Sequence, residues 1–467
     1  MMKKIILALI PLCFAVSCND FVDVVPKGNT IPETVDDLDK LMNLGVMSST
    51  SYTFTEISYN VDYFALYCDD YTLPTDPGHP YYSYNSITII ANLMKWSDPE
   101  ENSDNKWNGL YRSNYIANYV LDNIDLVKDG MTAKRSEVKG RALVHRALNY
   151  FILVNLYGKQ YDASAASTSA TDLGVPLVLE ADINKQYPRA TVAIVYEQIL
   201  TDLTEAISVM EVITPECSNI PSLPAAYALR ARVYLWMQNY DEAYNDAVSA
   251  LALNGKLIDY NDCAQVNPAY GPAAGITGYP TPAAINPEVM LARYKTSSIS
   301  MLYTDKMLAI TDTENDLRHT LFAYYMGEYL LLYYGFHNHS GINTSEVWLT
   351  KAEAALRKTS PNIPEAVAAL DHVRERRIKT TAYTPTTEND PAALLTEILN
   401  ERRREIRLTE MSFFDRKRLN VNPTTSRSMT RTFLGAEYTL AVGDLRYQLP
   451  IPTDVMQFNS QMIQNER

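Results

Sequence analysis

The sequence has few cysteines and, beyond its first residues, no long apolar run. Five cysteines occur in 467 residues. The three that follow residue 18 are Cys68, Cys217 and Cys263, and they share no spacing typical of a metal site. Because three cysteines form at most one disulfide, we expect small buried side chains. No apolar run after position 17 is long enough to cross a membrane, so this part of the chain should be water-soluble.

Basic residues are too few for a protein that binds nucleic acid. Lysine and arginine number 41 against 55 aspartate and glutamate residues, which gives a formal net charge of −14. A surface this acidic gains nothing from phosphate backbones, so we expect no nucleic-acid partner and a solvated acidic surface. The chain also lacks a glycine-rich phosphate loop before a helix and an H-E-x-x-H zinc motif.

Two short clusters offer metal ligands, and neither is complete. His337 and His339 would face the same side of an extended strand, but no third ligand is placed beside them. Asp69 and Asp70 could belong to a calcium site, although a charged loop is the simpler interpretation. We therefore predict no metal and no cofactor. A glycoside hydrolase needs two opposed carboxylates. A chain with 55 acidic residues can always supply a pair, so this count is no evidence for such an enzyme. We predict no enzyme.

The first residues have the pattern of a bacterial lipoprotein signal. A basic start is followed by an apolar stretch, Ile5–Val16, that is too short to span a bilayer. The small residues Ala15–Ser17 then precede Cys18 and resemble a lipobox. We predict a signal peptide at residues 1–17 and a lipid on Cys18, whose acyl chains contribute ~0.8 kcal/mol per buried methylene. Because Asn19 does not resemble an inner-membrane retention signal, we expect surface exposure on the outer membrane. An ordinary cleavage site with an incidental Cys18 is the alternative.

Apolar residues at a spacing of three or four predict a mostly α fold. Ala243, Ala247 and Ala250 form a small-residue stripe that lets two helices approach closely, and the spacing resembles a tetratricopeptide repeat. Ala352 and Ala355 belong to a second hairpin of similar form. Two hairpins are fewer than a free-standing solenoid needs, so they must pack on the rest of the chain. The predicted helices cover residues 35–45, 107–127, 136–157, 192–212 and 392–408, and the hairpins cover 224–252 and 346–379.

Two long segments, residues 48–105 and 256–344, lack a helical period and are rich in small, polar and tyrosine residues. Loops this long usually carry function. The chain has 33 tyrosines beside 11 phenylalanines and 4 tryptophans. Tyrosine combines a flat apolar face with a hydrated hydroxyl, so the excess points to a recognition surface. Packing at helix interfaces is the alternative for most of these side chains.

The run Glu401–Glu405 contains three consecutive arginines, and we interpret it as structural. Arg403 and Arg407 lie one helical turn apart. Their guanidinium groups can brace neighbouring loops through paired hydrogen bonds to carboxylates such as Asp415. Contact with nucleic acid is the alternative, and it conflicts with the net charge.

Six separated segments together resemble the SusD/RagB family of outer-membrane lipoproteins of Bacteroidetes. Each segment alone is a weak match to the family, but the six occur in the family's order along nearly the whole chain. One departure is Lys159–Asp172, which is longer than the family's usual link to its G-V-P motif. The segments are the lipobox with Asp23–Pro26, Trp107–Tyr111 with Asn118 and Leu121, Arg141–Gly158 followed by Gly174–Leu177 and Pro188–Thr191, Ala226–Leu251, Leu399–Glu405 followed by Phe413–Arg418, and Leu449–Pro452 with Gln464–Asn465.

The resemblance implies one SusD-like domain at residues 18–467, with tetratricopeptide-like hairpins as scaffold and irregular loops as binding face. We divide it into a helical half (18–255), a variable loop region (256–344) and a C-terminal half (345–467). The resemblance also implies a SusC-like TonB-dependent transporter as partner, over which the protein sits as a lid. Family members bind glycans and the RagB branch is associated with peptides. We therefore expect glycan capture, with peptide binding as first alternative and a surface glycoside hydrolase as second.

The aromatic residues of the two loops are the candidate ligand site. Sugars stack their C–H faces on tyrosine and tryptophan rings, and their hydroxyls pair with Asp, Asn and Arg side chains. Packing is the alternative for each residue. A further group of tyrosines has the spacing of a helix or a strand, and we expect these side chains in the core. They are Tyr324, Tyr325, Tyr329, Tyr333 and Tyr334. The selected ligand-binding candidates are Tyr81, Tyr82, Trp96, Tyr270 and Tyr279.

Overall fold

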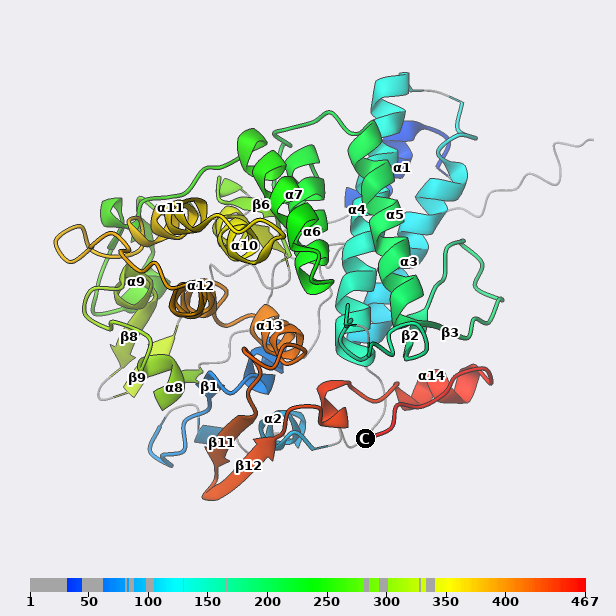
Figure 1. The fold of residues 1–467 in the computed structure, drawn as a ribbon. Coiled ribbons are helices and arrows are strands. Elements are labelled where there is room, and N and C mark those ends of the chain that lie inside the picture. The colour runs from blue at the N-terminus through cyan, green and yellow to red at the C-terminus, as the bar shows by residue number, and fades with distance from the viewer. Residues whose placement is uncertain are drawn as a thin grey trace, which may run out of the picture.

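Helices dominate the computed structural model of the chain, which confirms the mostly α class. Figure 1 shows one upright group of helices beside a second group that lies across it. The described residues are 32–43, 62–79, 82–83, 88–97, 105–128, 130–164, 166–280, 285–293, 301–326, 329–332 and 341–467. The division of the domain at residues 255 and 344 stays a prediction.

Helix α4 (Thr132–Tyr157) is the centre of the upright group and packs against its neighbours α1, α3 and α5. Its side chains are buried almost continuously from Val138 onward. The helix ends at Gly158, where a Cβ atom would lie 2.9 Å from the Val154 carbonyl oxygen, so only glycine fits without a shift. The neighbours are α1 (Val35–Asn43), α3 (Asn105–Asn123) and α5 (Val192–Val209), and the predicted helices here are confirmed with small differences at the ends.

The two predicted helical hairpins are also confirmed, and they pack side by side. Ala243, Ala247 and Ala250 are fully buried, as the small-residue stripe requires. Each second helix begins with an asparagine whose side chain accepts a backbone N–H: Asn239 from Glu242, and Asn362 from Glu365. The hairpins are α6 (Leu223–Trp236) with α7 (Tyr240–Leu253), and α10 (Thr344–Arg357) with α11 (Ile363–Arg374).

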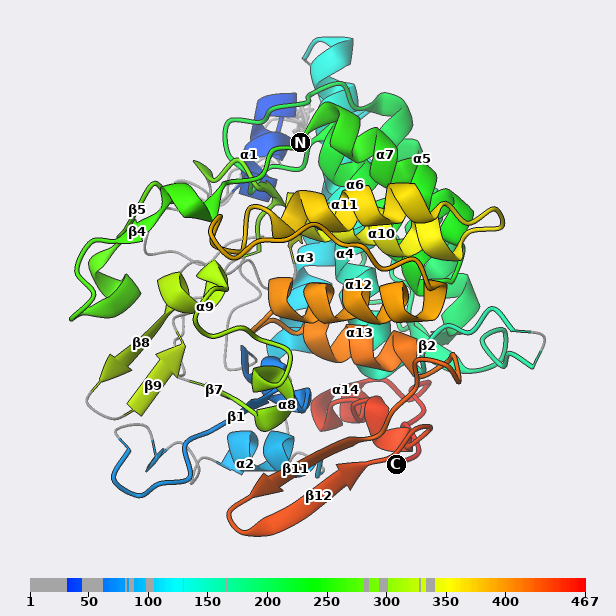
Figure 2. The ribbon, with the colours of Figure 1, turned by 60° about the vertical axis from the view of Figure 1, so that its left-hand side comes forward.

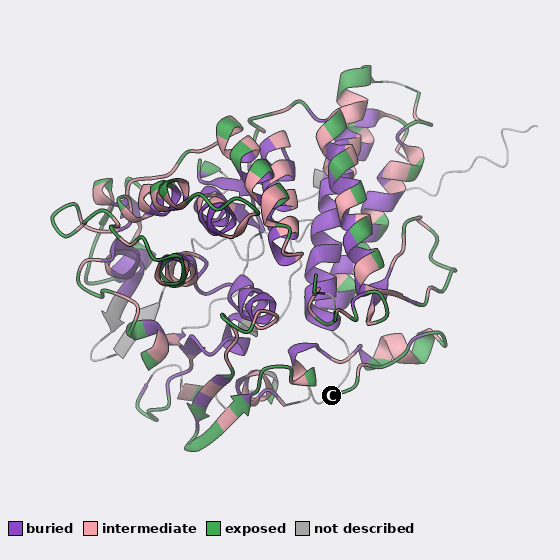
Figure 3. Ribbon diagram, viewed as in Figure 1, coloured by how far each residue is buried: buried purple, intermediate pink, exposed green. Residues whose placement is uncertain are grey.

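Buried arginines connect helix α12 (Pro391–Glu405) to its surroundings, including α13 (Met411–Leu419). The predicted bracing role is confirmed, but Asp415 pairs with Arg402, at 2.6 Å, and with Arg418, and not with Arg403 or Arg407. Arg402 lies on the buried stripe of α12, whereas Arg403 points toward the loops and pairs with Asp70. Arg407 donates to a tyrosine hydroxyl of the loop region. Figure 3 shows buried residues along α4, α10 and α13.

The two segments predicted as irregular contain many short elements. All strand pairs in the described ranges are antiparallel and two-stranded. In the first segment these elements are η2 (Asp62–Tyr67), β1 (Tyr71–Thr72) and α2 (Thr88–Lys95). In the second they are η4 (Tyr260–Asp262), β4 (Ala264–Gln265), η5 (Gly271–Ala274), β5 (Ile276–Thr277), β6 (Val289–Leu291), β7 (Leu302–Tyr303), α8 (Asp305–Leu308), α9 (Leu317–Phe322), β8 (Ala323–Met326), β9 (Tyr329–Leu332) and β10 (Ile342–Asn343).

The remaining elements lie at the bottom of the molecule in Figure 1. They are β2 (Leu173–Pro176), β3 (Arg189–Thr191), the hairpin β11 (Met429–Phe433) with β12 (Ala436–Leu440), η7 (Leu445–Tyr447) and α14 (Thr453–Phe458). In the described part of the chain, no helix combines the length and apolar character needed to span a membrane.

Candidate ligand-binding face

The two irregular segments form one side of the molecule, which we call the loop face. It consists of the described residues within 62–97 and 256–343. Figure 2 shows β4–β5, α9, β8–β9 and the segment around β1 along this side, with the helical hairpins beyond them. Strand β1 pairs with β7, which brings Tyr71 opposite Tyr303. The structure therefore joins two regions that lie more than 200 residues apart in the sequence.

Ion pairs of Asp69 and Asp70 reinforce this junction. Asp69 accepts hydrogen bonds from Lys306 at 2.6 Å and from Arg427 at 2.8 Å. Burial opposes ionisation of Asp69, but these two cations outweigh it and lower the pKa of the carboxyl to about 2. Asp70 pairs with Arg403. The two carboxylates lie close to Cys68, but their cationic partners already neutralise them. The geometry therefore favours a charged loop over a calcium site.

Trp96 lies beneath the loop face, and the expectation of an exposed ring there is wrong. Its exposed fraction is 0%. The indole N–H donates to the Tyr67 carbonyl oxygen at 2.8 Å, and the Arg431 guanidinium lies 4.4 Å from the ring centroid. The backbone of Trp96 has a positive φ of 50° at the end of α2. This turn directs the ring inward, which the composition of the segment does not reveal.

Tyr270 is the most exposed of the described candidates, with 70% of its surface open. Its backbone N–H donates to the Asn267 carbonyl oxygen at 3.0 Å, and the Asn267 side chain accepts from Ala269. Gly271 follows with a positive φ of 60° and begins η5. The turn therefore presents the Tyr270 ring on an ordered backbone, beside an amide side chain that can bind hydroxyl groups.

Tyr82 is half-buried at the edge of the loop face. Its backbone N–H donates to the His79 carbonyl oxygen at 3.0 Å. Tyr81 lies outside the described residues, as do Tyr333, Tyr334 and the two histidines of the candidate metal pair. Tyr324, Tyr325 and Tyr329 lie in strands β8 and β9, in agreement with their regular period.

Tyr279 packs in a small aromatic cluster of the loop face. Its ring contacts Tyr260 and Phe322 at centroid distances of 5.9 and 5.3 Å, and burial raises the pKa of its hydroxyl. The hollow beside these rings has a volume of about 30 Å³. This space accommodates a water molecule but not a sugar ring. Tyr279 therefore has a packing role here, the alternative left open by the sequence.

Two buried glutamates under the loop face share one cation. Glu288 and Glu405 lie 2.7 and 3.1 Å from the Arg377 guanidinium, which stacks on the Tyr260 ring at 4.0 Å. Burial raises the pKa of Glu288. Glu405 is also buried, but Arg377 and Arg318 outweigh this effect and lower its pKa to about 2. These carboxylates face one guanidinium and not each other across a cleft, so the pair is not arranged for glycoside hydrolysis. The sequence pattern contains no signal for this cluster.

Family models match both parts of the chain. One, described as starch-binding associating with outer membrane, matches residues 20–235, and one described as SusD family matches residues 337–467. The chain belongs to the SusD/RagB family. Membership supports a general role in carbohydrate binding and nutrient capture at the outer membrane.

Solved structures of the SusD superfamily share the fold over nearly the whole chain. A Bacteroides thetaiotaomicron protein is 22% identical with a TM-score of 0.69, covering 93% of this chain and 100% of the other. A Bacteroides fragilis protein is also 22% identical, with a TM-score of 0.70 and the same coverage of 93% and 100%. A SusD-like carbohydrate binding protein of Bacteroides vulgatus is 17% identical, with a TM-score of 0.65 and coverage of 92% and 98%. No curated protein matches the chain significantly.

Proposed function

We propose that this protein captures a glycan on the loop face and delivers it to a SusC-like TonB-dependent transporter. The observation that carries the proposal is the joining of the two tyrosine-rich segments into one surface within a SusD-family chain. Tyr270 offers an exposed ring on an ordered turn, and Tyr82 lies at the edge of the same surface. Rings of this kind stack on sugar faces while neighbouring amides and carboxylates bind the hydroxyls.

The proposed location is the outer surface of the outer membrane, with a lipid on Cys18. This residue lies outside the described residues, so its support is the lipobox-like sequence and the family description. The variant Cys18→Ala should release soluble protein or leave an uncleaved precursor. A processed form that still fractionates with the outer membrane would show that the anchor is elsewhere.

Incubation of the purified protein with a panel of polysaccharides tests glycan capture against its alternatives. We expect at least one glycan to be retained and recovered unchanged by chromatography after long incubation. Reproducible new products would establish the surface glycoside hydrolase instead. Failure across the glycan panel, together with retention of peptides, would establish the RagB-type peptide function. Co-purification with the transporter from membranes tests the delivery step, and its absence after cross-linking would reject that step alone.

A further inference from the structure

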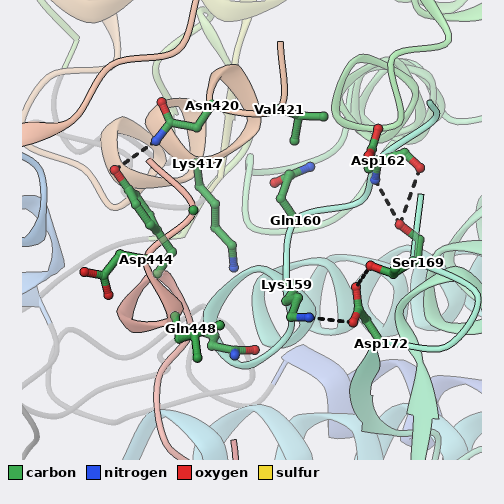
Figure 4. A pocket seen from close by; sticks show the side chains of 14 residues that line it. Lys159, Gln160, Asp162, Ser169, Asp172, Lys417, Asn420, Val421, Asp444 and Gln448 are labelled. Atoms are coloured by element: carbon green, nitrogen blue, oxygen red, sulfur yellow. Dashed lines mark hydrogen bonds and ion pairs between the residues drawn. The ribbon is translucent and has the colours of Figure 1, made fainter. Parts of the chain in front are cut away.

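A polar hollow lies away from the loop face, at the C-terminal end of α4. Its volume is about 360 Å³, enough for a sugar-sized molecule. Figure 4 shows that three separate parts of the chain line it. They are the segment 159–172, the end of α13 with the residues that follow it, and the turn 443–448. None of the aromatic candidates of the loop face contributes to this hollow.

One wall is the segment Lys159–Asp172, which departs from the usual family pattern by its length. Its described residues, 159–164 and 166–172, make contacts with one another. The Asp162 backbone N–H donates to the Ser169 hydroxyl at 2.9 Å, and the Lys159 ammonium pairs with Asp172 at 2.7 Å. These contacts fix polar side chains around an opening that a short link would not form.

The central group of the hollow is the ammonium of Lys417. It donates to the carbonyl oxygens of Asn155 and Gly158, at 2.7 and 2.6 Å, and so caps the end of α4. Within the described residues, no carboxylate lies within ion-pair distance of Lys417. Burial without a counter-charge lowers the pKa of Lys417 to about 7. An ammonium has three donors, so one remains for a ligand, and Figure 4 shows Lys417 extending into the hollow.

The rest of the wall offers hydrogen-bond acceptors. The Gln160 amide donates to the Tyr161 and Trp236 carbonyl oxygens, while its own buried oxygen has no partner. Asp162 and Asp444 add carboxylates, and each of these already contacts its own neighbours. Acceptors of this kind bind hydroxyl groups, whereas the Lys417 ammonium forms its strongest hydrogen bonds with an anionic group.

We propose that this hollow is a second ligand site that binds a small hydroxylated carboxylate, such as a sugar acid, with the carboxylate on Lys417. A neutral sugar would leave the buried ammonium without a counter-charge. A phosphate dianion would meet the carboxylates of Asp162, Asp172 and Asp444 on the surrounding walls. A single negative charge combined with several hydroxyls fits both features. The site is independent of the proposed glycan binding on the loop face.

Calorimetric titration of the full chain with D-glucuronate, D-glucose and acetate tests the proposal. We expect saturable binding of D-glucuronate and at least tenfold weaker binding of the other two. The variant Leu445→Trp should fill the hollow, because Leu445 lines it and is 37% exposed. This variant leaves Lys417 and its hydrogen bonds to the end of α4 in place, and it should weaken D-glucuronate binding at least tenfold. Val442→Trp is the matched control, since Val442 is 43% exposed directly before the same turn but does not line the hollow.

The pH dependence of binding gives a second readout. The charged groups that line the hollow with Lys417 are Lys159, Asp162, Asp172 and Asp444. Burial lowers the pKa of the Lys417 ammonium to about 7. D-glucuronate should therefore bind more weakly at pH 8.5 than at pH 6, as Lys417 loses its proton. No saturable binding, equal affinity for D-glucose, or an unchanged affinity in Leu445→Trp would each overturn the site.

Discussion

The helical hairpins and the loop face are stabilised over very different distances in the sequence. In α6–α7 and α10–α11, alanines one turn apart are buried against the partner helix of the same hairpin. The loop face depends on partners far along the chain, such as Asp69 with Arg427 and Tyr71 with Tyr303. Local periodicity therefore specifies the scaffold, whereas the binding surface forms only after distant segments meet.

Acidification should cause the largest loss of stability, because the helical scaffold depends on buried, ionised carboxylates. Glu353 and Glu401 are buried, which opposes ionisation, but Arg418 and Arg318 respectively outweigh burial and lower each pKa from 4.5 to about 2. The ionised groups stabilise the fold above about pH 4.5, and this stability is lost as pH falls toward 2. A pKa change of this size corresponds to about 3 kcal/mol for each group. Contributions that share arginines do not add.

Urea unfolding at pH 7, 4.5 and 3 measures this loss. We expect a small change in the free energy of unfolding between pH 7 and 4.5, and a steep decrease between pH 4.5 and 3. Equal unfolding free energies at pH 7 and 3 would show that these ion pairs do not contribute to stability.

Removal of one buried arginine should destabilise the fold far more than removal of an exposed arginine. Arg402 is fully buried and bridges Asp415 and Glu346, so Arg402→Ala removes the cation that these two carboxylates share and leaves each with one other arginine, Arg418 and Arg232 respectively. We expect a loss of about 3–5 kcal/mol in the free energy of unfolding by urea denaturation. Arg112→Ala is the matched control on exposed α3 surface, and it should change stability by less than about 0.5 kcal/mol. Similar values for both variants would contradict the role of the buried network.

Two aromatic rings of the first and second loop segments should behave in opposite ways. Trp96→Ala removes a fully buried ring under the Arg431 guanidinium, so we expect a loss of about 3 kcal/mol or more in unfolding free energy. Tyr270→Ala removes an exposed ring and should change stability by less than about 0.5 kcal/mol. Thermal melting of both variants checks this contrast. An unchanged melting temperature for Trp96→Ala would mean that its ring is not part of the core.

The same contrast explains which features could be predicted from the sequence. Helices and both hairpins follow from apolar period and from alanine stripes, because these signals lie within a few turns. The orientation of Trp96 could not be predicted, since it depends on Arg431 in a strand near the other end of the chain. The packing of Tyr279 likewise depends on Phe322 of α9. Composition singles out the tyrosine-rich segments as a candidate ligand site, which stays a prediction, but it does not separate exposed from buried rings.

The smallest expected effect concerns ligand affinity on the loop face. Tyr270→Ala, and separately Tyr82→Ala, should weaken binding of the glycan identified by the panel. We expect a loss of about 1–3 kcal/mol in binding free energy, by analogy with bases stacked on aromatic rings. This loss corresponds to roughly a tenfold to hundredfold higher Kd. Tyr115→Ala is the matched control, because Tyr115 is exposed on α3, outside the loop face. Titration of all three variants, each with an unchanged melting temperature, distinguishes stacking from general surface effects.

Normal binding by both loop-face variants would place the glycan elsewhere, since the exposed ring of Tyr270 could then be removed without loss. A decrease in Tyr270→Ala alone would instead restrict the site to the turn before η5, where hydrogen bonds order the backbone around an open ring.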